Sequence, residues 1–459
     1  MYRKKAEELI RWKNDPYRKP LLIYGGRQVG KTYLVRDIFA KENYQKVLYI
    51  DLAEDASARR FIKNHVNAGE IIQYLSIQKN TIIDSDTLLI FDEIQECMPL
   101  ITALKYFCQD YREIPVIATG SMVRIRLKQI EDGAIRKDPE IQEDTVFLFP
   151  VGKVDKIDLY PMTFSEFLFV RNTAFYNFLQ TSWKERKEIS QEYHDLGMKY
   201  FFEYMLIGGM PEAVDIFIQT GSYQRALMTL RNIYSNYLND MSLYQISSES
   251  LLRTRRVYEN VYAQLSKENK NFKISLIEKG KRFRDYYNPL DWLREARVIY
   301  PSYQLKEHVT LPLKEDEESL FRIYLADCGL FCLQSGISPQ TFLENNLANN
   351  TLSGIFFENY VADELAAHGI KLFYWKGKTS SELEFIIEHN GEIIPVDAKK
   401  NKGSLSSLNK YRENNAYGMS VKISQNHYGY SEQNHLLTIP YYYVSFWLDE
   451  LTESSEQQS

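Results

Sequence analysis

The chain has 459 residues, 44% of them hydrophobic and 25% charged, which suffices for several folded cores and excludes a globally disordered protein. The formal net charge of -5 argues against a protein that coats nucleic acid over its whole surface, but it allows a local basic patch. The N-terminus lacks an apolar signal segment and no run of about 18 apolar residues occurs, so we expect a cytoplasmic protein without membrane spans. The four cysteines are too few for a disulfide framework or a structural zinc site, and buried free thiols are expected.

After a short amphipathic helix predicted over residues 3–13, residues 20–32 (PLLIYGGRQVGKT) carry the strongest motif. An apolar run leads into the spacing G-x-x-x-x-G-K-[ST], and a helical pattern follows over residues 31–41. Glycines let the backbone wrap around phosphate groups, and the helix presents its positive N-terminal end to them. The pattern predicts an ATP site in which the catalytic Lys31 reaches the β- and γ-phosphates and Thr32 binds Mg²⁺. The expected nucleotide-binding residues are Gly25, Gly26, Arg27, Gln28, Val29, Gly30, Lys31 and Thr32.

The second motif is an apolar run that ends in two acids, TLLIFDE, at residues 87–93. It follows a predicted strand at 46–55 and helix-forming residues at 56–79. A continuous apolar run suits a strand buried on both faces, and open α/β sheets bind ligands at the carboxyl ends of their strands. We therefore expect Asp92 to contribute to the Mg²⁺ shell and Glu93 to orient and polarise the attacking water.

The same alternation continues with a helix predicted at 99–110 and a buried strand at 114–121 that ends in polar residues. Of these, we take Ser121 as the residue that senses the γ-phosphate. Residues 130–145 have little periodicity and are predicted to form a surface loop, and residues 154–168 supply the last strand and enter the next helix. Together these elements predict an α/β fold with a P-loop, AAA-like parallel sheet and helices on both faces.

Six motifs in this order resemble one family: GGRQVGKT, LLIFDEIQ, VIATGSM, DLYPMTFSEF, GGMPEAV and YLADCGL. They are similar to the prokaryotic AAA-type ATPases that carry a C-terminal domain of uncharacterised function. The resemblance covers nearly the whole chain. It implies an AAA-like core followed by a helical lid, a winged-helix-like segment and a C-terminal α/β domain of the restriction-endonuclease-like, PD-(D/E)xK fold.

One position departs from the family pattern. The family has Gly-Arg shortly before its Leu-x-Pro-Leu-Ser-Phe stretch, whereas this chain has Gly152 and Lys153. A lysine does not provide the forked contact of an arginine finger. The finger then comes from Arg124, from Arg126 or from a neighbouring subunit, and the last alternative requires a homo-oligomer.

Residues 165–245 are rich in helix-forming and aromatic residues and fit the lid, with GGMPEAV at 208–214 as a break between helices. A basic run follows, with ten Lys or Arg against three Glu between residues 253 and 284. Its apolar residues predict the core of two short helices: Phe272, Ile274, Leu276, Ile277, Tyr286, Leu290 and Leu293. With the resemblance, this run is either a winged-helix-like module that contacts DNA or an ordinary solvated face.

The C-terminal part begins after the acidic stretch 314–319 with a strand at 321–327 and an amphipathic helix at 352–370. Two hairpin strands at 372–377 and 381–387 and a third strand at 392–400 follow. The residues Glu358, Glu384, Asp397 and Lys399 match the outline of the PD-(D/E)xK nuclease site, in which acids bind Mg²⁺ and the lysine supports the attacking water. Glu384 replaces the family's Asp, Asp397 replaces its Glu, and Glu382 is an alternative ligand. The site is either a nuclease centre or an inactive scaffold that binds DNA or a partner.

The predicted domains are the ATPase core 1–165, the lid 166–245, the winged-helix-like segment 246–312, the PD-(D/E)xK-like domain 313–450 and a disordered tail 451–459. We expect a Mg²⁺-dependent ATPase, with ATP and Mg²⁺ as ligands, that controls a DNA-interacting and nuclease-like module. The alternative is an ATP-gated switch that binds a protein partner.

Overall fold

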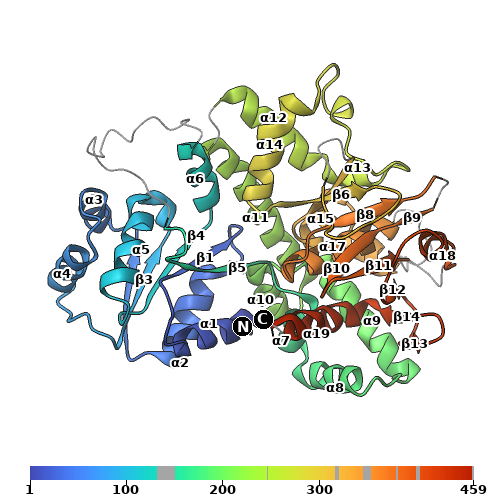
Figure 1. Cartoon of the computed structure of the whole chain (residues 1–459), viewed down its shortest axis with the longest axis horizontal. Helices are drawn as coiled ribbons and strands as arrows, with labels where there is room; N and C mark the ends of the chain where they lie inside the picture. The colour runs from blue at the N-terminus through green and yellow to red at the C-terminus, as the bar shows by residue number, and fades with distance from the viewer. Residues whose placement is uncertain are drawn as a thin grey trace. The chain divides into compact units, whose positions relative to one another are not determined.

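The computed structural model describes residues 1–131, 150–244, 247–315, 320–344, 353–378, 381–399 and 404–456 (Figure 1). Its chain divides into an N-terminal unit, Arg3–Tyr160, and a C-terminal unit, Pro161–Ser459 together with Met1–Tyr2. The surface loop expected over residues 130–145 lies outside the described residues from position 132 onward.

The N-terminal unit is built on a parallel sheet of five strands in the order β2-β3-β4-β1-β5. The strands are β1 (Leu21–Gly25), β2 (Lys46–Asp51), β3 (Thr87–Asp92), β4 (Val116–Gly120) and β5 (Asp155–Leu159). β1, β3 and β4 are buried along their whole length, as their unbroken apolar runs predict. This confirms the α/β class and the parallel sheet. Because β4 lies between β1 and β3, the segments that follow these three strands meet at one edge of the sheet.

Helices cover both faces of this sheet. They are α1 (Lys5–Asn14), η1 (Tyr33–Ala40), α2 (Lys41–Asn43), α3 (Ala56–Asn64), α4 (Ala68–Gln78), η2 (Ile94–Glu96), α5 (Pro99–Asp110) and α6 (Val123–Glu131). On one face, α3, α4 and α5 bury a core with alternating strand residues such as Leu89 and Phe91. Residues 56–79 form two helices instead of one, because Asn67 accepts hydrogen bonds from the Gly69 and Glu70 amides and starts α4.

The C-terminal unit begins with helices, as the composition of residues 165–245 predicts. These are α7 (Phe164–Arg171), α8 (Thr173–Lys184), α9 (Gln191–Ile207), α10 (Pro211–Thr220), α11 (Tyr223–Tyr244), α12 (Ser248–Glu259), α13 (Val261–Leu265), η3 (Ile274–Leu276) and α14 (Phe283–Glu295). The expected break after α9 is confirmed, since Gly208 adopts φ 75° there and Pro211 starts α10.

Two sheets follow in the C-terminal unit. The first has the order β7-β6-β8-β9 and contains β6 (Ile299–Leu305), β7 (Phe321–Leu325), β8 (Phe373–Lys376) and β9 (Glu382–Leu383). The second has the order β10-β11-β12-β14-β13 and contains β10 (Phe385–His389), β11 (Glu392–Ala398), β12 (Ser420–Ser424), β13 (Gly429–Ser431) and β14 (Leu436–Pro440). The run 381–387 is therefore split between two sheets at Glu384. β6 belongs to the segment predicted as winged-helix-like, which ends at position 312, and β7 belongs to the domain predicted to follow it. The two strands pair antiparallel with each other.

The remaining helices of this unit are α15 (Cys328–Ser335), α16 (Pro339–Glu344), α17 (Ser353–Ala367), α18 (Ser406–Arg412), η5 (Tyr441–Tyr443) and α19 (Val444–Glu456). Because α19 continues to Glu456, the expectation of disorder is wrong for residues 451–456, and positions 457–459 lie outside the described residues. All four cysteines are buried and free, as expected. Among the described residues, no helix is long and apolar enough to cross a membrane.

The basic run departs from its predicted core in one place. Phe272, Ile274 and Leu293 are buried, but Leu276 is 51% exposed. The turn η3 carries Leu276 on its outer side, so the expectation that this residue is part of a helix core is wrong.

Candidate functional site

The loop between β1 and η1 has the backbone that phosphate binding requires. Gln28 and Gly30 both adopt positive φ angles, 62° and 89°, and Val29 between them is buried. A Cβ on Gly25 would lie 2.4 Å from the carbonyl oxygen of Leu159, so only glycine fits at the start of the loop. These constraints make the glycine spacing of the sequence a consequence of close backbone packing.

Lys31 is folded back onto this loop. Its Nζ donates to the carbonyl oxygens of Gly26 at 2.8 Å and Gly25 at 3.2 Å, and the residue is only 7% exposed. Carbonyl oxygens are weaker partners for an ammonium than phosphate oxygens are. A bound triphosphate would therefore compete well for Lys31.

Asp92, at the end of β3, lies at the centre of a buried set of donors. Its Oδ2 accepts hydrogen bonds from Thr32 Oγ1 at 2.6 Å and from Tyr49 OH at 2.9 Å. Its Oδ1 accepts from the Thr119 hydroxyl and from the Glu93 amide at 2.9 Å. The donors are three hydroxyls and one amide, all neutral. Burial and the Asp92 carboxylate raise the pKa of Tyr49, so this phenol remains a donor.

The oxygens of Thr32 and Asp92 fit a magnesium ion. Mg²⁺ prefers oxygen ligands and is usually held by one or two protein side chains together with substrate phosphates. The 2.6 Å contact brings the two predicted metal ligands together, next to the loop expected to hold the phosphates.

Glu93 follows directly, in a left-handed backbone conformation with φ 52° that turns the chain sharply after β3. Its carboxylate accepts a hydrogen bond from the side-chain amide of Gln95. Ser121, the predicted γ-phosphate sensor, is buried at the end of β4 (9% exposed), yet it is Thr119 that contacts Asp92. Thr119 lies within β4, whereas Ser121 follows the last residue of this strand, Gly120.

Three residues of this site escaped the sequence reasoning: Arg3, Tyr49 and Gln95. Arg3 is 4% exposed and donates to the carbonyl oxygens of Val29 at 2.8 Å and Tyr160 at 2.7 Å. One arginine in a charged N-terminal segment gives no local signal that it contacts the glycine loop. Thr119 is one of the two polar residues at the end of the predicted strand, of which Ser121 was preferred.

Of the arginine-finger candidates within the chain, Arg124 pairs with Asp158 at 3.1 Å and lies over the Tyr24 ring. Both partners belong to the N-terminal unit. Arg124 therefore sits near the carboxyl end of β1, while Arg126, two positions further along α6, belongs to the same turn.

In the C-terminal unit, the predicted nuclease-site acids contact lysine and arginine side chains, whereas Asp92 contacts neutral donors. Glu358, on α17, is 2% exposed and accepts from Tyr324 OH at 2.6 Å. It forms ion pairs with Arg322 at 3.1 Å and with Lys270. Lys270, one of the ten cations of the basic run, thus pairs with a buried acid, and its side chain is 22% exposed. Arg322 also pairs with Glu382, the alternative ligand.

Lys399 connects the other two acids. Its Nζ lies 2.7 Å from Asp397 Oδ1 and 3.2 Å from Glu384 Oε1. Glu384 also accepts from the Ala398 amide at 3.2 Å. The sequence expectation that Asp397 and Lys399 share one face is confirmed by this contact.

Burial and charge compensation have opposite effects in this acid cluster, which we define as Glu358, Glu384 and Asp397, and their balance differs between the two glutamates. Burial would raise the pKa of Glu358, but Lys270 and Arg322 outweigh it and lower that pKa. Burial, with the neighbouring Asp397, raises the pKa of Glu384 to about 7 despite Lys399. Within the part of the chain that the structure describes, no group of three or more acidic, His or Cys residues is arranged to hold a metal.

Comparison with known proteins agrees with the N-terminal geometry. Residues 17–168 match the family model described as an AAA domain. Residues 198–341 and 353–442 match two models described as domains of unknown function, DUF8612 and DUF4143. The N-terminal part of the chain is thus similar to AAA domains, and the family descriptions of the segments that follow name no activity.

Two relatives illustrate the similarity. The uncharacterized protein MJ1544 of Methanocaldococcus jannaschii is 25% identical over 456 residues, which cover 94% of this chain and 88% of that protein. Among solved structures, the Walker-type ATPase PABY2304 of Pyrococcus abyssi matches 72% of this chain and 95% of its own, with 16% identity and a TM-score of 0.41.

Proposed function

We propose that the chain is a Mg²⁺-dependent ATPase whose N-terminal unit binds and hydrolyses ATP. The observation that carries the proposal is the contact between Thr32 and Asp92, next to Lys31 on its glycine loop. A hydroxyl, a carboxylate and an ammonium meet at the carboxyl edge of the sheet, where nucleotides bind in such folds. Mg²⁺ held by Thr32 and Asp92 would neutralise charge on the phosphates.

Each residue of the site has its own role in binding or hydrolysing ATP. Lys31 exchanges its carbonyl partners for phosphate oxygens, and the backbone amides of the loop hold the rest of the triphosphate. Glu93 accepts a proton from the attacking water, and Gln95 fixes its carboxylate through the amide hydrogen bond. Ser121 senses the γ-phosphate, and Thr119 holds Asp92 in position.

The test uses paired variants of the full chain. Lys31→Ala is expected to lose ATP binding, and Glu93→Gln to bind ATP but retain it without turnover. Glu96→Gln, three residues further on, is the matched control and should hydrolyse ATP like the wild type. Binding of a fluorescent ATP analogue and steady-state phosphate release separate the two defects. Unchanged turnover in Glu93→Gln would remove the catalytic assignment.

For the C-terminal unit we propose nucleic-acid contact through the basic run and a nuclease-like scaffold. The placement of the predicted site residues supports the scaffold: β10 pairs antiparallel with β11 and β11 parallel with β12 in one sheet, Glu384 directly precedes β10, and Asp397 lies on β11. An arginine from a second copy of the chain would complete the ATPase site in a homo-oligomer.

Whether this scaffold cleaves is a separate question, and one observation favours an inactive scaffold. Lys270, Arg322 and Lys399 already compensate the acid cluster, so a divalent cation would have to displace ammonium groups. The alternative function, an ATP-gated switch that binds a protein partner, follows from the same observation.

Plasmid nicking with Mn²⁺, together with thermal melting with and without Mn²⁺ in the absence of nucleotide, tests the scaffold. The matched variants are Asp397→Ala and Lys399→Ala. A scaffold predicts no nicking and no Mn²⁺-induced increase in melting temperature. Nicking that disappears in both variants would instead establish a nuclease.

A further inference from the structure

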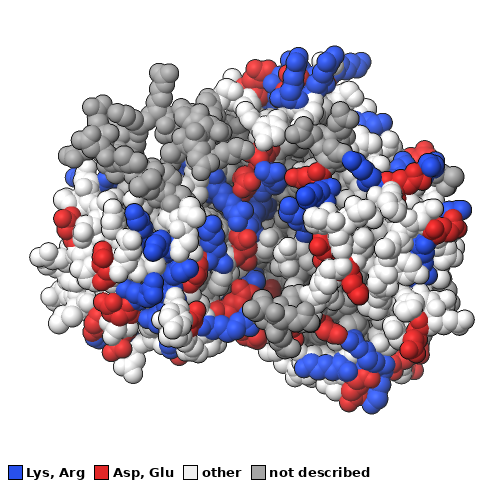
Figure 2. Space-filling model, viewed as in Figure 1, with Lys and Arg blue, Asp and Glu red and all other residues white. Residues whose placement is uncertain are grey.

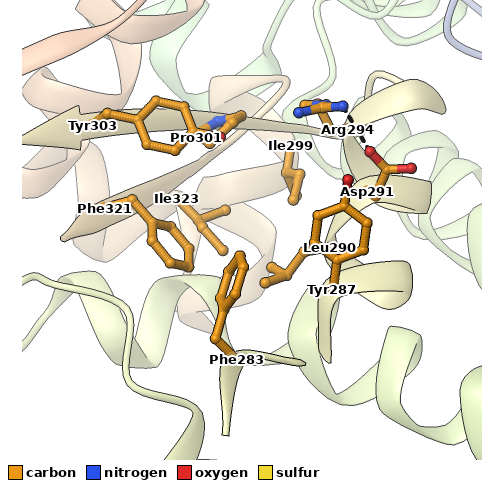
Figure 3. Close-up of a pocket in the computed structure, with 10 residues that line it drawn as sticks. All are labelled: Phe283, Tyr287, Leu290, Asp291, Arg294, Ile299, Pro301, Tyr303, Phe321 and Ile323. Carbon is orange, nitrogen blue, oxygen red and sulfur yellow. Dashed lines mark hydrogen bonds and ion pairs between the residues drawn. The ribbon is translucent and has the colours of Figure 1, made fainter. Parts of the chain in front are cut away.

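A pocket opens in the C-terminal unit between the start of α14 and the antiparallel strands β6 and β7 (Figure 3). Its floor is apolar, formed by Leu290, Ile299 and Ile323. Its walls are aromatic, and they are formed by Phe283, Tyr287, Tyr303 and Phe321. The cavity volume is about 60 Å³. Since one water needs about 10–15 Å³ of such space, the pocket accepts a group of the size of a single ring.

The aromatic residues at the mouth are unusually accessible. Phe283 and Tyr287 are each 50% exposed. The ring of Phe283 packs edge-on against Tyr287 at 6.1 Å and against Phe321 at 5.7 Å, so the three rings form one continuous wall (Figure 3). Half-exposed rings beside an apolar hollow are costly to hydrate and mark binding sites. A flat aromatic ligand would cover one ring by stacking and its neighbour by an edge-to-face contact, because the planes of Phe283 and Tyr287 are 77° apart.

The charge around the pocket determines which flat ligand fits. Between positions 279 and 294 the sequence has five cations, Lys279, Lys281, Arg282, Arg284 and Arg294, against the two acids Asp285 and Asp291. Both acids are engaged locally, because Asp291 pairs with Arg294 at 2.6 Å and Asp285 accepts from the Arg282 amide at 2.8 Å. Arg282 and Arg284 flank Phe283 and are exposed. Figure 2 shows Lys and Arg side chains gathered over this region, around α12 and α14.

We propose that this pocket binds one unpaired base of single-stranded nucleic acid, which stacks on the ring of Phe283 and meets that of Tyr287 edge-on, while Arg282 and Arg284 contact the flanking phosphates. The proposal rests on the nucleic-acid contact proposed above and specifies its substrate class. A paired base in a duplex keeps its faces stacked on its neighbours and cannot enter. Aromatic residues interleaved with cations are the arrangement that binds single strands, because every base offers a ring face and every linkage a negative charge.

The experiment measures fluorescence anisotropy of three labelled ligands on the full chain: an oligothymidylate of about 12 nucleotides, its abasic counterpart of equal charge, and a duplex of equal length. The wild type should bind the oligothymidylate about 5- to 100-fold more tightly than the abasic strand, as expected for one stacked base. Phe283→Leu keeps an apolar side chain but removes the ring, and it should abolish this preference. Tyr287→Leu is a second variant of the same wall, and Tyr430→Leu, an aromatic residue 56% exposed on β13, is the matched control.

The charge variants separate this proposal from the one on which it rests. Arg282→Glu with Arg284→Glu should weaken all three ligands and flatten the salt dependence, since fewer counterions are released. If the three ligands bind equally and Phe283→Leu changes nothing, the base pocket is wrong although the basic run still binds nucleic acid. If none binds, both proposals fail, and an apolar side chain of a protein partner becomes the better occupant.

Discussion

Asp92 in the N-terminal unit and Glu358 in the C-terminal unit are both buried carboxylates at predicted metal sites, but the protein satisfies them in opposite ways. Asp92 accepts hydrogen bonds from the hydroxyls of Thr32, Tyr49 and Thr119, which carry no charge. Glu358 is neutralised by Lys270 and Arg322. The same residue type at two predicted metal sites therefore has two different sets of partners.

The difference has a physical consequence for ligands. A carboxylate surrounded by neutral donors gains by meeting a cation, because its charge has not been compensated. A carboxylate already paired with buried cations gains little from a further cation and loses its existing pairs. On this basis we expect a divalent cation to gain more at the first site than at the second.

The largest expected effect is a difference in ATP turnover between two variants, each of which lacks one acid of the two predicted metal sites. Asp92→Ala should lower ATP turnover by at least about 100-fold, because both the charge and the anchor of Thr32 are lost. Asp397→Ala should leave ATP turnover near that of the wild type. Steady-state hydrolysis at saturating Mg²⁺ measures both, and an equal loss in the two variants would mean that the clusters serve one reaction.

The second prediction concerns Arg322, which is 1% exposed and pairs with Glu358 and Glu382. Arg322→Met removes one of the two cations paired with the buried Glu358, and it should reduce the free energy of unfolding by about 3–5 kcal/mol. Arg294→Met removes a pair whose arginine side chain is 45% exposed, and it should cost less than about 1 kcal/mol. Urea unfolding of both variants measures the contrast, and similar losses would show that Glu358 does not depend on compensation.

The third prediction uses a second acid of α17. Glu364 is as buried as Glu358 but accepts from the Phe164 amide at 2.6 Å and a serine hydroxyl, and burial raises its pKa to about 7. As the pH rises from about 4.5 to about 7, the unfolded chain loses this proton before the folded protein does, so stability falls across that window. Glu364→Gln should remove up to about 3 kcal/mol of this fall and be more stable than the wild type at pH about 8.

Glu358→Gln is the matched control for this pH dependence. The pKa of Glu358 is lowered to about 2, so its contribution is present above about pH 4.5 and is lost as the pH falls toward 2. The variant should therefore be less stable than the wild type at neutral pH. Melting curves across the pH range measure both variants, and pH profiles that shift in the same direction would contradict the comparison.

The smallest effect is expected at Tyr49. Tyr49→Phe keeps the ring beside Arg36 but removes the donor to Asp92. Residues that orient a metal ligand typically affect metal affinity or activity by about 10-fold or more when changed, so activation by Mg²⁺ should weaken by about 10-fold. Titration of ATP turnover with Mg²⁺ measures this, with Tyr17→Phe, a residue 75% exposed, as the control. An unchanged titration would assign Tyr49 to packing alone.

The sequence by itself determined the parts of the molecule that depend on local pattern. The spacing of Gly25, Gly30 and Lys31 predicts the loop because a tight backbone turn permits few residue types. The buried run before Asp92 predicts β3, and the helix predicted at 99–110 is confirmed by α5. Local pattern was less reliable where a side chain starts a new helix, as Asn67 does. It was also less reliable where a polar sequence was taken to mark the end of folded structure, as at the C-terminus.

Only the tertiary structure decided which charges meet. Lys270 pairs with Glu358 from 88 positions away, and Arg3 reaches Val29 from 26 positions away. A buried carboxylate needs a partner, but the sequence around it does not say whether that partner is a hydroxyl or a cation, because the path of the chain brings the partner from elsewhere. The folded chain places three hydroxyls next to Asp92, and it places a lysine and an arginine next to Glu358.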